Sequence, residues 1–315
     1  MKISDIAKKI DAKIIGNPET LISGISSLNN PKNGTLILVK KQKHILELAD
    51  IDCFFLAENH LEKFLKNQKS LIVNNSSKAF SILTFIFNKN NCSSNFNSQL
   101  YKKGKKVKVG KNCLFGMNVV LEDNVSIGEN VSLSHNVVIK KNVIIGNNVV
   151  IDSGTIIGSE GFGNFKDENH SWHHFNHLGN VRIGDNVSIG SNCCIDRGTI
   201  DDTLINDGVI IDNLVHIAHN VIIGENTAIA AKVGIAGSCI IGKRNMIGGM
   251  VGIIDHIETA DDVIISATST VHKNILEPGH YTGIMPISKH YLWKRIALQI
   301  TKLDKMMKFL KLKKK

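Results

Sequence analysis

From residue 109 to residue 271, apolar side chains recur at every sixth position. Two breaks divide this pattern into three runs, and 23 of its 24 positions are apolar, the exception being Thr259. An Asn also stands three residues after each of the first seven apolar positions. The apolar positions of the first run are Val109, Phe115, Leu121, Ile127, Leu133, Ile139, Ile145, Ile151 and Ile157, and the later runs are Ile183 to Ile195 and Ile205 to Val271.

A period of six fits neither an α-helix nor a two-faced strand. It predicts a solenoid in which three sides of six residues make one coil, with one inward aliphatic residue per side. Stacked coils would pair as parallel strands, and Asn or Gly would take the positive φ angles of the corners. The pattern therefore predicts a parallel β-helix of hexapeptide repeats.

The two breaks in the pattern predict loops expelled from the solenoid. The step from Ile157 to Ile183 is 26 residues, which is 20 more than one period, and the step from Ile195 to Ile205 is ten, which is four more. Insertions of this kind often build the binding face of a repeat protein.

The segments on either side of the solenoid lack the six-residue pattern, and we expect domains at 1–98, 99–275 and 276–315. The first is predicted to be a small α/β domain, and the last a loop ending at Pro286 followed by an amphipathic α-helix. The N-terminal expectations are a helix capped by Ser4 and running to Ile10, strands at 12–15, 35–39 and 53–56, a buried helix or strand at 79–88, and a linker at 88–97. The C-terminal helix is expected from Leu292, Ile296, Ile300, Leu303, Met307 and Leu310, and we favour self-association over packing on the solenoid for its apolar face.

Charge and composition narrow the class of protein. The formal net charge is +10, and residues 302–315 hold seven Lys and one Asp. This tail is either solvated or directed at an acidic protein or an anionic membrane surface; no aromatic-interleaved basic face favours nucleic acid. The six Cys form no C-x-x-C pair, which disfavours a disulfide framework and a zinc ribbon. No signal peptide or membrane-spanning stretch is visible, so we expect a cytoplasmic protein.

Candidate chemistry gathers at one corner of the predicted coils. Residue 237, one coil beyond His219, is a Gly, and His256 follows the next stacked position, so the three fall within roughly 10 Å, or two strand spacings. A neutral imidazole can accept a proton and a Gly N–H can bind an oxyanion. An acyl-transfer site requires these two groups, a general base and an oxyanion donor. Asp212 could orient the imidazole. The alternative is a surface histidine on a non-catalytic scaffold.

The first expelled loop is rich in histidine, and two adjacent cysteines follow it. The loop holds His170, His173, His174 and His177, but their spacing matches no standard zinc pattern, so we favour a lid over a metal site. Cys193 and Cys194 are expected to fill the coil. We therefore expect no metal.

Several motifs of this chain resemble the bacterial UDP-3-O-acylglucosamine N-acyltransferases of lipid A biosynthesis. They are G-F-G at 161–163, I-D-R-G-T-I-D-D-T at 195–203, D-N-L-V-H-I-A-H-N at 212–220, A-G-S at 236–238 and I-G-G-M at 247–250. The resemblance implies an N-terminal uridine-binding domain, a left-handed parallel β-helix, a C-terminal helix, and a homotrimer with active sites between subunits. It implies transfer of a 3-hydroxyacyl chain from the phosphopantetheine of acyl carrier protein to the 2-amine of UDP-3-O-acyl-glucosamine, without a cofactor of the enzyme's own.

The resemblance also implies roles for single residues. His219 matches the general base, Gly237 the oxyanion donor, His256 a second active-site histidine and Asp212 a carboxylate partner of the base. Asn213 and His216 match positions near the sugar or its phosphates, with His216 in place of the usual Gln, and Lys273 falls where a basic residue meets acyl carrier protein.

The N-terminal domain departs from the family pattern. Ile37 and Lys43 stand where the family has the Phe and Tyr that sandwich uracil, and Lys40 stands where it has Asn. The lysines could instead meet a diphosphate or guard an edge strand. Another sugar nucleotide therefore stays open as acceptor: O-acyl transfer to UDP-N-acetylglucosamine, or N-acyl transfer to another amino sugar. The small residues at 267–270 predict no short acyl chain, but they do not set its length.

Overall fold

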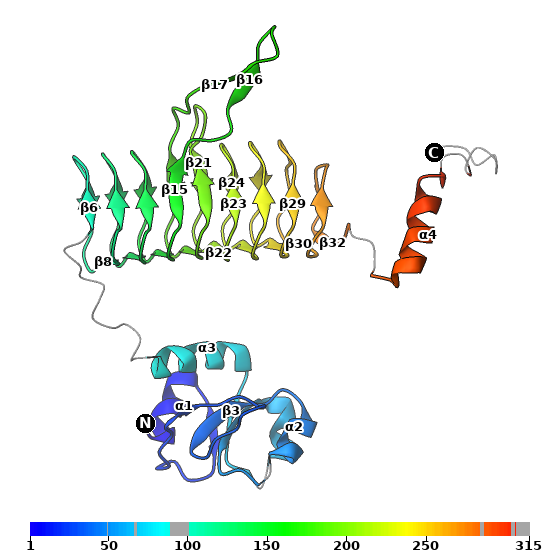
Figure 1. The fold of residues 1–315 in the computed structure, drawn as a ribbon. Helices are drawn as coiled ribbons and strands as arrows, with labels where there is room; N and C mark the ends of the chain where they lie inside the picture. Colours follow the sequence, from blue (N-terminus) through cyan, green and yellow to red (C-terminus); the bar gives the residue numbers. More distant parts are fainter. Residues whose placement is uncertain (49, 66–67, 89–100, 284–286, 304–305, 307–315) are drawn as a thin grey trace. The chain divides into compact units, whose positions relative to one another are not determined.

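The computed structural model describes residues 1–48, 50–65, 68–88, 101–283, 287–303 and 306. The chain separates into two compact units, Met1–Ser94 and Asn95–Lys315, and each is described by itself (Figure 1).

The N-terminal unit is a five-stranded sheet covered by helices. The strand order is β1-β5-β4-β3-β2, with β1 antiparallel to β5 and the other neighbours parallel. The strands are β1 (Lys13–Ile15), β2 (Gly24–Ile25), β3 (Thr35–Leu38), β4 (Phe54–Glu58) and β5 (Ser70–Val73); the helices are α1 (Ile3–Ile10), α2 (Gln42–Glu47), the 3-10 helix η1 (Asn59–Phe64) and α3 (Ser76–Phe87). Two separate apolar clusters, one containing α1 and α3 residues and the other α2 and η1 residues, flank the sheet.

The N-terminal elements match the expected α/β domain, with two differences. The segment 79–88 is a helix, whose cap Asn75 accepts a hydrogen bond from Lys78 N–H. The cap expected at Ser4 is wrong, because α1 begins at Ile3 and Ser4 lies inside it. A capping side chain is unnecessary here, since the N–H groups of Ile3 and Ser4 donate to the carbonyls of Thr20 and Pro18.

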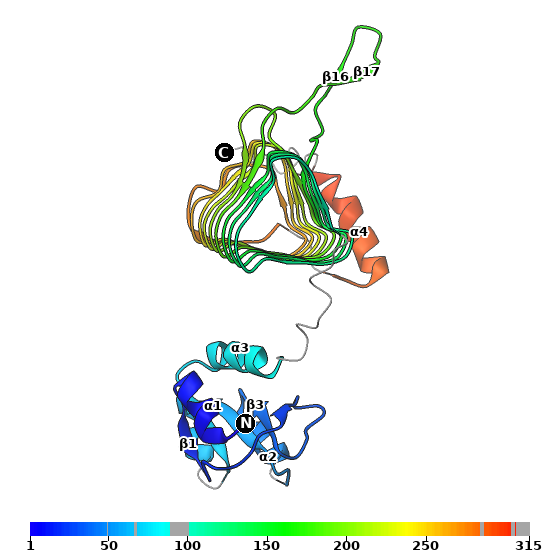
Figure 2. The ribbon, with the colours of Figure 1, turned by 90° about the vertical axis from the view of Figure 1, so that its left-hand side faces the viewer.

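The second unit is a parallel β-helix with three faces, seen end-on as a triangle in Figure 2. Face 1 consists of β7 (Lys108–Val109), β10 (Ser126–Ile127), β13 (Ile144–Ile145), β18 (Val181–Ile183), β21 (Thr203–Ile205), β24 (Ile222–Ile223) and β27 (Ile240–Ile241). Face 2 consists of β8 (Leu114–Phe115), β11 (Ser132–Leu133), β14 (Val150–Ile151), β19 (Ser188–Ile189), β22 (Ile210–Ile211), β25 (Ala228–Ile229), β28 (Met246–Ile247), β30 (Val263–Ile265) and β32 (Gly279–Tyr281). Face 3 consists of β6 (Lys102–Lys103), β9 (Val120–Leu121), β12 (Val138–Ile139), β15 (Ile156–Ser159), β20 (Cys194–Asp196), β23 (His216–Ile217), β26 (Gly234–Ile235), β29 (Gly252–Ile253) and β31 (Thr270–Val271).

The corners take the conformation that the Asn pattern predicts. Each Asn of the first seven repeats has φ between 56° and 64°, in the left-handed region. Their side chains also join successive coils: Asn112 Nδ2 donates to Asn130 Oδ1 at 3.1 Å, and Asn130 Nδ2 to Asn148 Oδ1 at 3.1 Å. The corner residues therefore form amide ladders along the solenoid.

The core has more inward side chains than the sequence pattern counts. Besides the residue on the six-residue pattern, the residue two positions earlier is buried, as Val119 is beside Leu121 and Val215 beside Ile217. The expectation of one inward aliphatic per side is therefore wrong for most sides, because the last corner residue also points inward. The doubled columns give a core of Val and Ile.

Both expected excursions leave the solenoid at the breaks. The first carries a small hairpin of β16 (Asn164–Lys166) and β17 (Trp172–His174), which projects from the coils in Figure 2. Beyond the solenoid, α4 spans His290–Ile300 and has no buried residue among those described. Pro286, the linker positions 89–97 and the helix positions Met307 and Leu310 lie outside the described residues. No described helix has the length and apolar character of a membrane span.

Thr259, the exception to the apolar pattern, anchors a buried polar network. Its hydroxyl accepts hydrogen bonds from Gly242 N–H at 3.0 Å and Asn245 Nδ2 at 2.7 Å. Asn245 Oδ1 accepts in turn from Val263 N–H. Thr259 and Asn245 are both buried, so the hydroxyl replaces water as the acceptor for the Asn245 amide.

We expect Thr259→Val to lower the free energy of unfolding by about 1–3 kcal/mol, because it leaves the amide of the buried Asn245 and the N–H of the half-buried Gly242 without an acceptor. Thr259→Ser keeps the hydroxyl and should cost clearly less. Urea denaturation of both variants measures the difference. Equal losses in Val and Ser would show that the methyl group, not the hydroxyl, carries the stability.

Candidate active site

The roots of the two excursions are fastened to the coils by Arg197 and Asn220. Arg197 is 2% exposed, and its guanidinium donates to the carbonyls of Gly158 at 3.1 Å and Lys141 at 2.6 Å. Asn220 accepts from Thr199 N–H through Oδ1 and donates to Asp201 O through Nδ2, each at 2.9 Å. These contacts explain why the I-D-R-G-T-I-D-D-T segment can leave the coil while β20 and β23 stay in register.

His219 lies directly against Gly237 on the next coil. A Cβ placed on Gly237 would stand 2.5 Å from His219 Cε1 and 2.7 Å from Nε2, so only glycine allows this approach. Among the described residues, no acceptor is bonded to Gly237 N–H. A ring nitrogen and a free backbone donor are thus adjacent, as the stacking of the sequence predicts.

The side chain that orients His219 is not Asp212. Asp212 stands at the opposite end of β23, where its Oδ1 accepts hydrogen bonds from Asn213 N–H and Nδ2. His219 Nδ1 instead lies 3.1 Å from Asn220 Oδ1 and 3.4 Å from Thr199 Oγ1. An Nδ1–H that donates to this amide oxygen leaves Nε2 unprotonated, beside Gly237. The expected Asp212–His219 pair is therefore not formed within this chain.

The other predicted site residues of the solenoid, His256, Asn213 and His216, lie either at a corner of the coils or along the outward side of face 3. His256 N–H donates to Gly237 O at 3.0 Å, which brings its backbone to the expected corner, but its side chain is exposed. Asn213 is a corner residue, accepting from Ser191 N–H at 2.7 Å. His216 points outward from face 3, beside the buried Asp196. At the third coil, Asp255 rather than His256 lines the groove described next.

A groove of about 600 Å³ runs along face 3 from His216 and His219. The outward positions in register along it are His216, Gly234, Gly252 and Thr270. A Cβ on Gly234 or Gly252 would meet nothing within 4 Å, so the missing side chains open the groove. Phe162 of the G-F-G motif also lines it. No side chain therefore projects into the groove at these two neighbouring positions.

His177 from the first excursion is a buried neighbour of His219. Its side chain is 0% exposed, its ring centroid lies 5.2 Å from that of His219, and neither ring nitrogen has a hydrogen-bond partner among the described residues. A Cβ on Gly161 would stand 2.7 Å from His177 Nε2, and one on Gly163 would clash with Cε1. Burial lowers the pKa of His177, and the nearby His219 lowers it further. His177 is therefore a neutral wall of the site.

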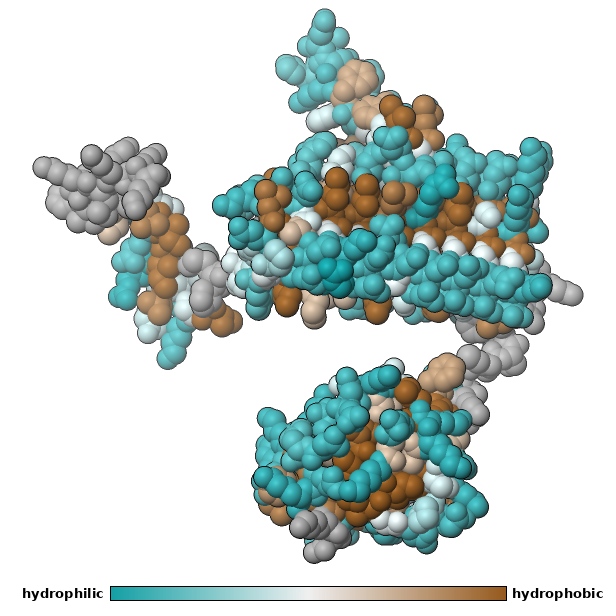
Figure 3. All heavy atoms as spheres, turned by 180° about the vertical axis from the view of Figure 1, so that it is seen from behind, coloured by the Kyte–Doolittle hydropathy of each residue, from teal (hydrophilic) through white to brown (hydrophobic). Residues whose placement is uncertain are grey.

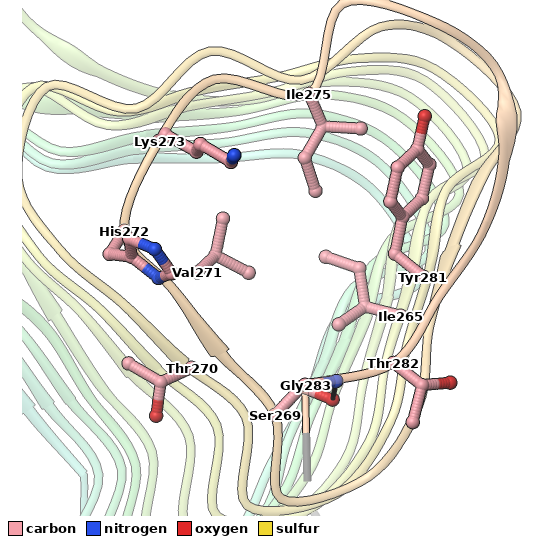
Figure 4. A pocket seen from close by; sticks show the side chains of 10 residues that line it. All are labelled: Ile265, Ser269, Thr270, Val271, His272, Lys273, Ile275, Tyr281, Thr282 and Gly283. Atoms are coloured by element: carbon pink, nitrogen blue, oxygen red, sulfur yellow. Dashed lines mark hydrogen bonds between the residues drawn. The ribbon is translucent and has the colours of Figure 1, made fainter. Parts of the chain in front are cut away.

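Of the other expected site residues, Ile37, Lys40 and Lys43 belong to the N-terminal unit, and Lys273 lies at the last coil of the solenoid. Ile37 is 0% exposed in the core between β3, α2 and η1, so it is a packing residue and not a ligand contact. Lys40 and Lys43 are exposed. Lys273 lines a hollow of about 180 Å³ at the last coil, together with Ile265, Val271 and Tyr281 (Figure 4). This hollow is the open end of the core and holds no pair of groups suited to acyl transfer.

The histidine-rich excursion does not gather into a metal site in the described part of the chain. Its His173 pairs with Asp167 at 2.8 Å and stacks on Phe165. Of the two adjacent cysteines, Cys193 is buried in the core as expected, but Cys194 points outward on face 3, next to Asp196. Cys193 directly precedes β20 and Cys194 begins it, so the alternation of an extended chain places their side chains on opposite sides.

Comparison with known families supports the repeat pattern. The model described as bacterial transferase hexapeptide (six repeats) matches residues 106–141 and 202–237, and the one described as hexapeptide repeat of succinyl-transferase matches 180–213. Proteins named UDP-3-O-acylglucosamine N-acyltransferase are similar over 150 residues: that of Delftia acidovorans is 35% identical, covering 48% of this chain and 44% of its own, and that of Albidiferax ferrireducens is 41% identical, covering 48% and 45%. These matches span less than half the length of the relatives.

Solved structures show the same fold. The UDP-N-acetylglucosamine O-acyltransferase of Moraxella catarrhalis superimposes with a TM-score of 0.54 at 25% identity, over 59% of this chain and 70% of its own. The Francisella novicida UDP-N-acetylglucosamine acyltransferase gives a TM-score of 0.54 at 25% identity, over 63% and 72%. The second unit is thus a left-handed parallel β-helix, and its repeats are similar to those of the bacterial hexapeptide transferases. Within that class, its resemblance to the UDP-3-O-acylglucosamine N-acyltransferases is confirmed over the matched 150 residues.

Two residues that position His219 were missed from the sequence. Asn220 belongs to the quoted 212–220 motif and follows His219 directly, so its adjacency was a usable signal. His177 comes from an excursion whose path the repeat does not encode. Its only sequence signal was membership of a histidine-rich loop, which gives no contact partner.

We expect acid to destabilise the region around His177. In the folded chain the pKa of His177 is lowered from its ordinary value of 6.5. Below pH 6.5 the unfolded chain therefore binds more protons at this residue than the folded chain does. Stability is full above that pH and is lost as the pH falls through the lower folded pKa. His177→Gln should therefore reduce the fall in thermal midpoint between about pH 7 and about pH 5. His170→Gln, at an exposed position of the same excursion, is the matched control; equal pH slopes in all three proteins would contradict the prediction.

Proposed function

We propose that this chain is an N-acyltransferase of lipid A biosynthesis. It transfers a 3-hydroxyacyl chain from the thioester of acyl carrier protein to the 2-amine of UDP-3-O-acyl-glucosamine. The observation that carries the proposal is the contact of His219 with Gly237 at the head of an apolar groove. The matched relatives, at up to 41% identity, bear the name of this activity.

The chemistry follows from the two adjacent groups. His219 Nε2 accepts the proton of the amine as its nitrogen attacks the thioester carbonyl carbon. Gly237 N–H donates to the oxyanion of the tetrahedral intermediate. The C–S bond then breaks, and the imidazolium returns the proton to the phosphopantetheine thiolate. Asn220 and Thr199 hold the tautomer that leaves Nε2 free at the start.

The groove of face 3 suits a hydrocarbon chain. Its wall combines the glycine positions with the apolar residues Ala218, Ala236 and Ile254, and it leads away from His219. A thioester carbonyl at Gly237 would leave the acyl chain to follow the open column toward Thr270. Burying each CH₂ there would contribute about 0.8 kcal/mol.

The proposed assembly is a homotrimer with acyl carrier protein as partner. Exposed outward residues of face 2, among them Val150, Ile210, Met246 and Ile264, form an apolar row suited to a subunit contact. Figure 3 shows hydrophobic side chains gathered along the visible side of the solenoid. Lys273, exposed at the last coil, is available to the acidic carrier protein. The N-terminal unit would bind the uridine nucleotide through contacts other than Ile37.

The purified chain should acylate UDP-3-O-acyl-glucosamine from an acyl carrier protein thioester, forming an amide that mass spectrometry detects. His219→Ala should lower kcat by about 10²–10⁴-fold, because the proton acceptor is lost, while the thermal midpoint stays near that of the wild type. Asp212→Asn should keep nearly full activity, since Asp212 does not contact His219.

Two results would contradict the proposal. Ester formation on UDP-N-acetylglucosamine alone would make the chain an O-acyltransferase, the activity named for the similar solved structure from Moraxella catarrhalis. Unchanged turnover in His219→Ala would show that His219 is not the general base. The alternative of a surface histidine on a non-catalytic scaffold would then be favoured.

The groove also predicts a change of donor preference. Gly252→Leu places a side chain in the open column, so the KM for long acyl thioesters should rise and shorter chains should become the preferred donors. Ser126→Leu adds similar bulk on the outward side of face 1 and should leave the profile unchanged. Competition between donors of different length measures both variants, and an unaltered preference in Gly252→Leu would show that the acyl chain runs elsewhere.

A further inference from the structure

Three metal-ligating side chains from two neighbouring strands meet on the outward side of face 3. Cys194 and Asp196 are alternate residues of β20, and His216 on β23 is in register with Cys194. One possible ligand atom from each lies within 4.8 Å of the others. This cluster is distinct from the His219–Gly237 pair, although His216 lines the same groove.

The carboxylate in this cluster is buried without adequate compensation. Asp196 is 5% exposed, and within the described chain its carboxylate is hydrogen-bonded only by the Cys194 thiol, with Sγ 3.5 Å from Oδ1. His216 Nε2 stands 3.6 Å from Oδ2, beyond hydrogen-bonding distance. By contrast, Asp202 accepts bonds from Arg182 and from two nitrogens of Asn180. A buried carboxylate normally has such partners or a metal ion.

The distances within the cluster fit a tetrahedral ion. Bond lengths of about 2.0–2.3 Å to S, N and O ligands give ligand–ligand distances of roughly 3.3–3.5 Å at tetrahedral angles. The Cys194–Asp196 and Asp196–His216 separations are 3.5 and 3.6 Å. These two separations run to different carboxylate oxygens, Oδ1 and Oδ2, and one ligand atom from each residue lies within 4.8 Å of the others, so coordination requires the three side chains to close around the ion.

The donor set selects the kind of ion. A thiolate and an imidazole with one carboxylate suit Zn²⁺ and related transition metals, whereas Mg²⁺ and Ca²⁺ prefer oxygen ligands alone. Three protein ligands leave a fourth position open, and one of the three, His216, borders the groove. Ser159 Oγ on the adjacent coil is a further polar atom beside the cluster, 3.4 Å from Cys194 Sγ.

We propose that Cys194, Asp196 and His216 bind a divalent transition-metal ion of the Zn²⁺ type at the head of the face 3 groove. Binding requires the Cys194 thiol to release its proton to solvent, the carboxylate to be ionised and the imidazole to be neutral, so affinity rises with pH. This role for His216 replaces the contact with a sugar or phosphate that the resemblance implies. The site does not depend on the proposed acyl transfer.

The test is titration of the chelator-treated full chain with Co²⁺. A thiolate ligand gives a charge-transfer band in the near ultraviolet, and tetrahedral geometry gives intense visible d–d bands. We expect both bands, saturation at one equivalent per chain, and their loss on addition of Zn²⁺. Histidines of the excursion cannot produce the thiolate band, so weak binding there does not mimic the result.

The two adjacent cysteines supply a matched pair of variants. Cys194→Ser should abolish the charge-transfer band, whereas Cys193→Ser, whose side chain is in the core, should retain it. His216→Gln, at a half-exposed position, should weaken Co²⁺ affinity by at least about tenfold. Absence of the band in the wild type, or its persistence in Cys194→Ser, would overturn the proposal. None of these readouts uses transferase activity, so failure of the proposed function leaves this test intact.

Discussion

The backbone hydrogen bonds between successive coils hold this solenoid in register, and everything at the site follows from that register. Residues one coil apart pair directly, as Cys194 does with His216 and His216 with Gly234. The inward aliphatic columns fix which residues face the core, so every alternate strand residue must face outward. The outward positions do not contribute to the core, so their residue types can vary. On face 3 four of them in register are His216, Gly234, Gly252 and Thr270.

The solenoid could be predicted from the sequence because the same short-range pattern of apolar and corner residues recurs in every coil. The six-residue period, the positive φ of the corner Asn residues and the two excursions all appear where the pattern places them. The contact of His219 with Gly237 was predictable for the same reason, since one coil separates them. Where prediction failed, the deciding partner came from outside the repeat: loop carbonyls near residue 20 replaced the cap expected at Ser4.

Orientation within the site was less predictable than position. A catalytic triad and the family resemblance both predict Asp212 as the partner of His219, but within this chain Asp212 lies at the far end of β23 and bonds to Asn213. The neighbouring amide of Asn220, itself bonded to Thr199 N–H, takes that place. Ile37 illustrates the same limit, because matching it to an aromatic position gave no information that both sides of β3 are packed in apolar clusters. The position of His177 depends on how an excursion folds back, which no periodicity encodes.

The way the excursions are attached to the coils separates variation of the loop sequence from stability of the solenoid. In many proteins a gain in one of these properties costs the other. Arg197 and Asn220 tie the loop roots to carbonyls and amides of the coils, so the strands continue to pair across the excursions, with one register shift at Ile157/Ser159. The hairpin beyond those ties can lengthen, shorten or change composition while the cooperative unfolding unit stays the same. Selection can thus reshape the rim of the groove in small steps without loosening the rod that carries it.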